Sequence, residues 1–163
     1  MVNKTSQLQI RVSPSDKARL HRLARQAGQD LSSYVLSKVL PDDRERITRQ
    51  IDALKIDAER SYALAELHDW LMSASAPEFV SISEGLDVSA LEPLWQNYVA
   101  ALIEQAADRK AVPPPAWVAR VRPLEQPWFA VPFASLRLHL IKSAPVPFKR
   151  RNIFVDTGLG SRV

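Results

Sequence analysis

The segment from residue 7 to residue 12 alternates strictly between polar and apolar side chains. In an extended strand the two kinds lie on opposite faces, which places Gln7, Gln9 and Arg11 together on the polar face. Because one short strand cannot satisfy its own edge, we expect it to pair with the same strand of a second copy about a two-fold axis. The apolar face of that ribbon would consist of Leu8, Ile10 and Val12.

Two helices are predicted after the strand. The segment 13–16 has a capping serine, a proline suited to the first helical position and an acidic residue three after the cap. Gly28 supplies a left-handed stop, Asp30 or Ser32 can cap a second helix, and Pro41 interrupts it. Helical spacing brings a set of apolar residues to the inner faces. These are Leu20, Leu23, Ala24, Ala27, Leu31, Val35 and Val39.

The middle of the chain has a mostly helical pattern. Residues 42–73 repeat apolar positions at near-heptad spacing, which is typical of a packed or oligomerising helix. Residues 74–87 contain proline, glycine and several serines, so we predict a loop there, with one short strand at 79–82. A further helix is expected over 88–109, with a proline tolerated in its first turn.

The last part of the chain, residues 111–163, differs from the rest in composition. Eight of the twelve prolines lie in residues 111–163, among many aromatic residues. A solvated linker is poor in aromatics, so we expect an extended path over an apolar surface, either the chain's own helices or another protein. A short helix within 133–143 and a basic turn into a strand at 149–155 are predicted inside it.

The expected fold is mainly α-helical, in three regions. Residues 1–41 form a strand that pairs with a dimer mate, followed by two helices. Residues 42–110 form a helical region for oligomerisation or partner binding. Residues 111–163 form a basic, extended tail rich in proline and aromatic residues.

Composition and charge narrow the class of protein. The chain has 163 residues, 46% hydrophobic and 25% charged, with no cysteine, no apolar run long enough for a membrane and no signal segment at Met1. A cytoplasmic protein is expected. Residues 1–40 hold seven Lys or Arg against two acidic residues, residues 41–110 seven against fourteen, and residues 111–163 eight against two. A basic first region suits a polyanion such as DNA.

The polar face of the strand has side chains that can recognise bases. Glutamine pairs bidentately with adenine and arginine with guanine, and a two-stranded ribbon fits the major groove. We therefore interpret Gln7, Gln9 and Arg11 as base contacts. A solvated face is the ordinary role of basic residues on a helix, and we assign it to Arg19, Arg22 and Arg25.

Residues 7–40 resemble the ribbon-helix-helix repressors, the group of the Arc and MetJ repressors and of many bacterial antitoxins. The resemblance implies base contacts from Gln7, Gln9 and Arg11, and phosphate contacts from Ser32 and Ser33 at the start of the second helix. Lys4 is expected to contact phosphate as well. The sequence departs from the family at Asp30, where a neutral cap would suit a phosphate better. The implied dimer core consists of Leu8, Ile10, Val12, Leu20, Leu23, Val35 and Val39.

The tail also resembles a known segment, and it suggests a protein partner. Residues 143–155 are similar to part of the antitoxins found beside nucleotidyltransferase-like toxins. The basic triplet 149–151 could anchor DNA, dock a partner or be plain surface, and we favour docking because apolar residues flank it. The predicted partner-binding residues are Trp117, Trp128, Phe129, Phe148, Lys149, Arg150, Arg151 and Phe154.

No arrangement typical of an enzyme or a metal site emerges. There is no nucleophile with a base, no glycine-rich phosphate loop among four glycines, and no metal-ligand spacing, since His21, His68 and His139 are far apart in sequence. We expect no enzymatic activity, no metal and no cofactor.

Together these features predict a homodimeric, sequence-specific DNA-binding antitoxin that represses its own transcription. Its partners would be a double-stranded operator and a protein toxin neutralised through the C-terminal region, and the resemblance of the tail implies a toxin of the nucleotidyltransferase-like class. The alternative is a plasmid partition or mobilisation accessory protein, in which residues 42–110 would build higher oligomers. A third interpretation is an interaction module that does not bind DNA and whose first strand only dimerises.

Overall fold

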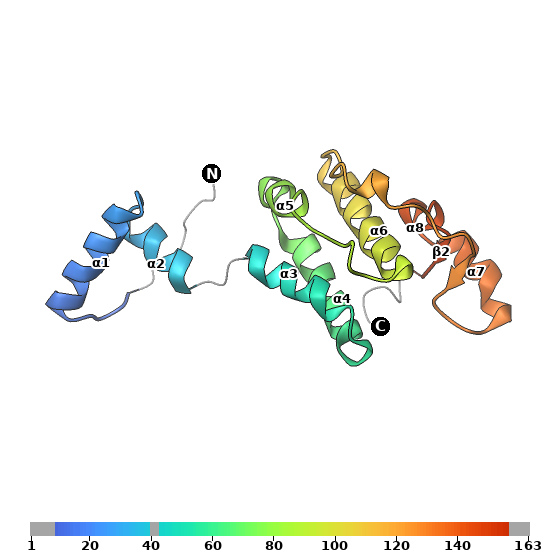
Figure 1. The fold of residues 1–163 in the computed structure, drawn as a ribbon, viewed down its shortest axis with the longest axis horizontal. Helices are drawn as coiled ribbons and strands as arrows, with labels where there is room; N and C mark the ends of the chain where they lie inside the picture. Colours follow the sequence, from blue (N-terminus) through green and yellow to red (C-terminus); the bar gives the residue numbers. More distant parts are fainter. Residues whose placement is uncertain (1–8, 40–42, 157–163) are drawn as a thin grey trace. The chain divides into compact units, whose positions relative to one another are not determined.

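The computed structural model describes residues 9–39 and 43–156 (Figure 1). The chain divides into two compact units, Met1–Asp42 and Asp43–Val163, called unit 1 and unit 2 below. Among the sequence predictions, those for Lys4, Gln7, Leu8 and Pro41 fall outside the described residues.

Unit 1 contains the two predicted helices, α1 (Pro14–Gln26) and α2 (Leu31–Val39), which pack against each other. Ser13 caps α1, and its Oγ accepts a hydrogen bond from the amide of Asp16 at 3.1 Å. Gly28 has a φ of 66°, the left-handed conformation that favours glycine, and it reverses the chain between the helices. Local capping and turn chemistry therefore placed both helices correctly.

The predicted N-terminal ribbon is wrong. Residues 9–13 belong to no helix or strand. In the described part of the chain the only strands are β1 (Trp128–Phe129) and β2 (Ile153–Phe154), a short parallel pair in unit 2. The alternating pattern shows which side chains would share a face, but a strand also needs a neighbour for its backbone groups. No strand among the described residues pairs with this segment, and Ile10 and Val12 are exposed.

The predicted long helix over 42–73 is a hairpin of two helices, α3 (Asp43–Ala53) and α4 (Asp57–Ser73). The chain turns at residues 54–56, where the Leu54 side chain is fully buried and the amide of Ile56 donates to the Ala53 carbonyl at 3.0 Å. Arg60 Nε then donates to the Leu54 carbonyl at 3.0 Å. No glycine or proline marks this turn, so the apolar periodicity runs through it without a visible break.

The predicted loop at 74–87 contains a helix, α5 (Ala76–Ser83), in place of the expected strand. Ser75 donates to the Glu78 carboxylate from its amide at 3.0 Å and from its hydroxyl at 2.7 Å, and Pro77 lies in the first turn. This is a capped helix start whose proline suits the first turn, although a proline among serines is also typical of a loop. Phe79 is buried and stacks on Trp70 at 6.3 Å between ring centroids.

The next helix, α6 (Pro93–Lys110), begins five residues later than predicted, because residues 88–92 form a turn before it. It lies in the middle of unit 2 and packs against α4 on one side (Figure 1). Its other neighbours come from the predicted tail, which is folded onto unit 2. Ala111 ends α6 in the left-handed conformation, with a φ of 53°.

The predicted tail is a series of short elements. It comprises η1 (Val118–Arg120), β1, η2 (Ala134–Leu136), α7 (Arg137–Ser143), α8 (Val146–Lys149) and β2. The amide of Trp128 donates to the Asn152 carbonyl at 2.8 Å and that of Ala130 to the Phe154 carbonyl at 3.0 Å, which joins β1 to β2. The expected short helix near 133–143 and strand near 149–155 are both present. The sequence left two surfaces open for the tail, the chain's own helices and another protein. In the structure the tail packs on the chain's own helices.

The core of unit 2 draws on helices and tail alike. Large apolar side chains from α3 to α6 meet others from η1, α8 and β2. Within the described residues no helix combines the length and the apolar character needed to cross a membrane. Major members of the core are Ile47, Leu54, Leu67, Leu71, Phe79, Val99, Ile103, Phe148 and Ile153.

Candidate nucleic-acid interface

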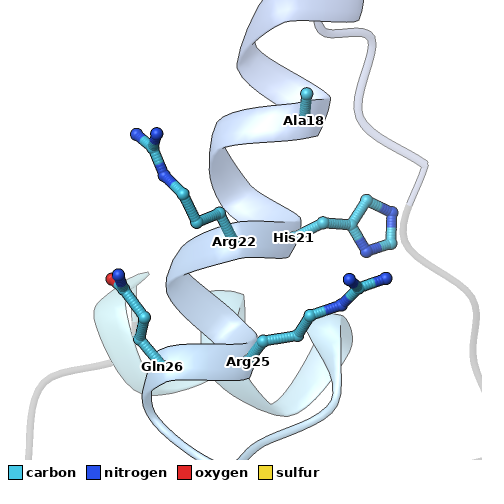
Figure 2. A pocket seen from close by; sticks show the side chains of 5 residues that line it. All are labelled: Ala18, His21, Arg22, Arg25 and Gln26. Carbon is cyan, nitrogen blue, oxygen red and sulfur yellow. The ribbon is translucent and has the colours of Figure 1, made fainter.

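Helix α1 presents its polar face to solvent. The apolar residues Leu20, Leu23 and Ala24 lie on one side of the helix, and the opposite side carries polar and cationic residues with one alanine. An open hollow of about 490 Å³ lies on this opposite face (Figure 2). Its lining residues are Ala18, His21, Arg22, Arg25 and Gln26.

Figure 2 shows how these side chains are arranged. Arg22 and Gln26 leave one flank of the helix, and His21 and Arg25 leave the other. Ala18 lies one turn earlier, where its short side chain fills little of the space between the flanks. The result is a shallow surface with two guanidinium groups and an imidazole ring at its edges.

The cations of α1 are not neutralised within the described part of unit 1. Arg19, Arg22 and Arg25 make no ion pair there and are exposed. The two acidic residues in the described part of unit 1 serve as helix-start groups, since Asp16 accepts from the Ser13 hydroxyl at 2.6 Å and Asp30 from the Ser33 amide at 3.0 Å. Positive potential is therefore concentrated on the face of α1 that points away from α2.

The residues predicted to contact DNA from the strand and from α2 have different surroundings. Gln9 and Arg11 are exposed and precede α1. At the start of α2, the amide and the hydroxyl of Ser33 both donate to the Asp30 carboxylate. A phosphate there would have to displace a carboxylate that already uses these donors, and the like charges would repel. Ser32 is exposed beside it.

The residues predicted to form a dimer core are poorly covered in a single chain. Leu20, Leu23 and Val35 are half-buried, and the described part of unit 1 has one fully buried side chain, Ala24. Others are open to solvent, with exposed fractions of 59% for Ile10 and 69% for Val39. A unit of this size buries too little apolar surface to be stable by itself.

The residues predicted to bind a partner mostly build unit 2. Phe148 is buried against Tyr98 at 5.2 Å between ring centroids, and Phe129 stacks on Phe154 at 4.9 Å. Trp117 donates from Nε1 to the Ser83 carbonyl at 2.8 Å. Trp128 and Lys149 are half-buried and Arg151 is buried, which leaves Arg150 as the exposed member of the set. The sequence pattern indicates an apolar segment with cations, but it does not indicate which surface this segment covers.

Arg151 holds the tail to α6 through a network that the sequence did not reveal. Its guanidinium donates to the carbonyls of Val118 at 3.1 Å and Val121 at 3.3 Å, and to Asn97 Oδ1 at 3.4 Å. It also lies 3.4 Å from the Glu104 carboxylate, which pairs with Arg150 as well. A signal was present, because Glu104 interrupts the broad apolar face of α6 while the tail carries surplus cations.

Titration and ligation add little to the chemistry of unit 2. Burial raises the pKa of Tyr98, so its phenol stays protonated. Among the residues that the structure describes, no three His, Asp or Glu side chains gather as a metal site would require.

Comparisons with protein-family models, with curated proteins and with solved structures found no match to this chain.

Proposed function

We propose that this chain is a DNA-binding protein whose unit 1 contacts phosphates through the polar face of α1, while unit 2 is a separately folded module for protein contacts. The observation that carries the proposal is the set of exposed, unneutralised arginines on α1, opposite the side that packs on α2. No ribbon is needed for this mode of binding.

The spacing of the arginines supports contact with a DNA backbone. Arg22 and Arg25 lie one turn apart on the exposed face, and Arg19 extends the same charge toward the start of the helix. Guanidinium groups bind phosphate oxygens through paired hydrogen bonds, and each phosphate neutralised releases a counterion. Arg11, which is also exposed, adds a further cation just before α1.

Dimerisation of unit 1 is part of the proposal. The half-buried and exposed apolar residues of α1 and α2 would be covered by the same residues of a second copy, which supplies the core that one copy lacks. Two copies would present two α1 faces to one duplex, as suits a two-fold symmetric operator.

The biological role predicted from the N-terminal resemblance, an autorepressing antitoxin, agrees with this division of labour. DNA binding would lie in unit 1 and toxin binding on the surface of unit 2. Co-purification of the untagged chain with the product of a neighbouring gene tests this role, and a neighbouring relaxase or partition ATPase would favour the plasmid accessory role.

Fluorescence anisotropy with labelled duplex DNA tests the proposal for α1. We expect Arg22→Ala/Arg25→Ala to weaken binding about tenfold or more at about 0.1 M salt. Since two α1 faces meet the duplex, the dimer loses four phosphate contacts of about 0.9 each, and the plot of log affinity against log salt should become shallower by about 3.6.

The matched control is Arg120→Ala/Arg122→Ala. It removes the same charge from two exposed arginines of unit 2 that have no ion pair within the described residues. We expect this variant to bind nearly as tightly as the parent. Equal losses in both variants would mean that total charge, and not α1, governs binding, and would overturn the assignment.

A further inference from the structure

Unit 2 leaves a group of large apolar side chains uncovered around α7. Leu140 is buried beneath this helix, whereas Leu138 and Ile141, three residues apart, lie on its outer side. The exposed fractions are 63% for Leu138 and 64% for Phe133. We call this group the α7 surface, and it consists of Phe133, Leu136, Leu138, Ile141 and Val146.

The α7 surface is cationic at its edges. Residues 126–155 contain no Asp or Glu, and α7 itself carries Arg137 and Lys142. Arg137 is held over the Phe129 ring at 5.0 Å, and His139 Nε2 lies 3.0 Å from the Asp156 carboxylate. These contacts fix the orientation of α7, so its outer side chains are presented by a supported helix.

A second uncovered face in unit 2 lies on α4. The inner side of this helix is buried through Leu67, Trp70 and Leu71. The outer side carries a stripe at helical spacing, with Tyr62 exposed at 67% and Met72 at 43%. We call this the α4 surface, and it consists of Ala58, Tyr62, Ala65, Asp69 and Met72.

The one charged residue of the α4 surface, Asp69, is acidic. Glu59 and Glu66 flank the stripe, and Arg49 borders it beside Ala58 and Tyr62. Glu66 is partly neutralised by Arg46 at 3.2 Å, while the Asp69 side chain is exposed beside His68 at 3.9 Å. At the end of the stripe, Arg109 Nη1 donates to Met72 Sδ at 2.9 Å. Apolar contact with this surface therefore suits a cationic partner.

Within unit 2 the two surfaces cannot meet, because α6, α8 and β2 separate α4 from α7 (Figure 1). Both are largely apolar, and the exposed carboxylate of Asp69 on α4 is complementary to the exposed ammonium of Lys142 on α7. We propose that the α7 surface of one copy packs on the α4 surface of a second copy, in a head-to-tail contact between units 2. Such a contact is heterologous, so it builds a ring or an open chain of copies.

This inference does not depend on DNA binding by unit 1. Because α7 is short, the contact is expected to lie at the small end of specific interfaces, with affinity in the micromolar range. Attraction between exposed charges is screened by salt, so assembly should weaken as ionic strength rises. In the full chain it would join dimers of unit 1 into larger assemblies on DNA.

A mixing experiment tests the contact on residues 43–163, which have their own core. One variant, Leu138→Ser/Ile141→Ser, removes the α7 surface, and the other, Tyr62→Ser/Met72→Ser, removes the α4 surface. Sedimentation velocity at about 0.05 M salt should show concentration-dependent assembly of the parent. Each variant alone should associate at least about tenfold more weakly.

The decisive sample is the mixture of the two variants, since each retains the surface that the other lacks. We expect the mixture to form a discrete dimer and no larger species. A monomeric parent, undiminished assembly of either variant, or a monomeric mixture would overturn the proposal. If the α7 substitutions weaken only the binding of residues 43–163 to anionic vesicles and leave their assembly unchanged, the proposal is overturned as well.

Charge variants keep the test decisive if a serine variant unfolds. Lys142→Glu changes one exposed side chain on α7, and Asp69→Lys changes one on α4. Each alone should weaken assembly several-fold at low salt, and mixing the two should restore it because the reversed charges meet. Failure of the mixture to recover, with both proteins folded by circular dichroism, would exclude the pairing of these two surfaces.

Discussion

Unit 1 and unit 2 differ in where their apolar side chains lie. Of the fully buried apolar residues in the described chain, Ala24 alone belongs to unit 1. Unit 2 buries helices and tail around α6, and the backbone carbonyls of Val118 and Val121 accept hydrogen bonds from the Arg151 guanidinium. Since apolar burial is the main term that opposes chain entropy, unit 2 can be stable alone, whereas the proposed second copy would supply the burial that unit 1 lacks.

The two units also differ in whether their arginines have acidic partners. In unit 2 several arginines pair with carboxylates, as in Arg46 with Glu66 and Arg150 with Glu104, although Arg120 and Arg122 have no such partner within the described residues. In unit 1 the arginines of α1 have no such partner within the described residues. A surface that keeps its cations unpaired is suited to an external anion, and this contrast is the basis of the assignment of DNA binding to unit 1.

The largest expected effect comes from emptying the core of unit 2. Phe79→Ala should lower the free energy of unfolding of unit 2 by about 3–5 kcal/mol, because it removes a buried ring that packs on Trp70. Urea denaturation followed by circular dichroism of residues 43–163 measures the loss. The control Ile56→Ala, at an exposed position, should change it by less than about 0.5 kcal/mol. Similar losses in both would mean that unit 2 lacks this core.

Neighbouring arginines in the tail give a second comparison. Arg151→Ala should cost about 3 kcal/mol of stability, because buried carbonyls and Asn97 lose their donor. Arg150→Ala, which removes an exposed arginine from the same carboxylate, should cost less than about 1 kcal/mol. The same denaturation assay separates them, and equal costs would show that the tail is not fixed through Arg151.

Dilution should lower the stability of unit 1 and leave the stability of unit 2 unchanged. If a second copy supplies the core of unit 1, each tenfold dilution lowers the stability of the dimeric unit by about 1.4 kcal/mol. Hydrogen exchange of the full chain at two concentrations reports this change for the amides of α1 and α2. Amides of α6 serve as the internal control and should not respond. Protection of α1 that is independent of concentration would contradict dimerisation.

The smallest effect concerns the start of α5. Hydrogen bonds from the Ser75 hydroxyl and amide lower the pKa of Glu78, so the charged carboxylate stabilises the folded state above its ordinary pKa. This contribution is lost as the pH falls through the lowered value. Ser75→Ala should cost about 1 kcal/mol at neutral pH and less at low pH, as measured by denaturation at both. A cost that grows on acidification would rule out this capping role.

The sequence was most informative where local chemistry alone decides the structure. Ser13, Pro14 and Gly28 defined α1 and its end, because caps and left-handed turns depend on a few adjacent residues. The ribbon failed for the opposite reason. A strand depends on a neighbour that the pattern at residues 7–12 does not contain.

Tertiary packing explains the other differences. Burial of the Leu54 side chain and backbone hydrogen bonds stabilise the turn at residues 54–56, which contains no glycine or proline. The aromatic residues of the tail were recognised as covering an apolar surface, but composition cannot distinguish the chain's own α6 from a foreign protein. The exposed face of α1 could be located from the sequence, whereas the lack of neutralising carboxylates around it required the structure.

The most direct test of the contrast between the two units is the salt dependence of DNA binding by the full chain and by residues 43–163 alone. We predict that the full chain binds duplex DNA with an affinity that falls steeply with salt, and that unit 2 alone binds at least about a hundredfold more weakly at about 0.1 M salt. Equal affinity and equal salt dependence of the two proteins would contradict the assignment of DNA binding to unit 1.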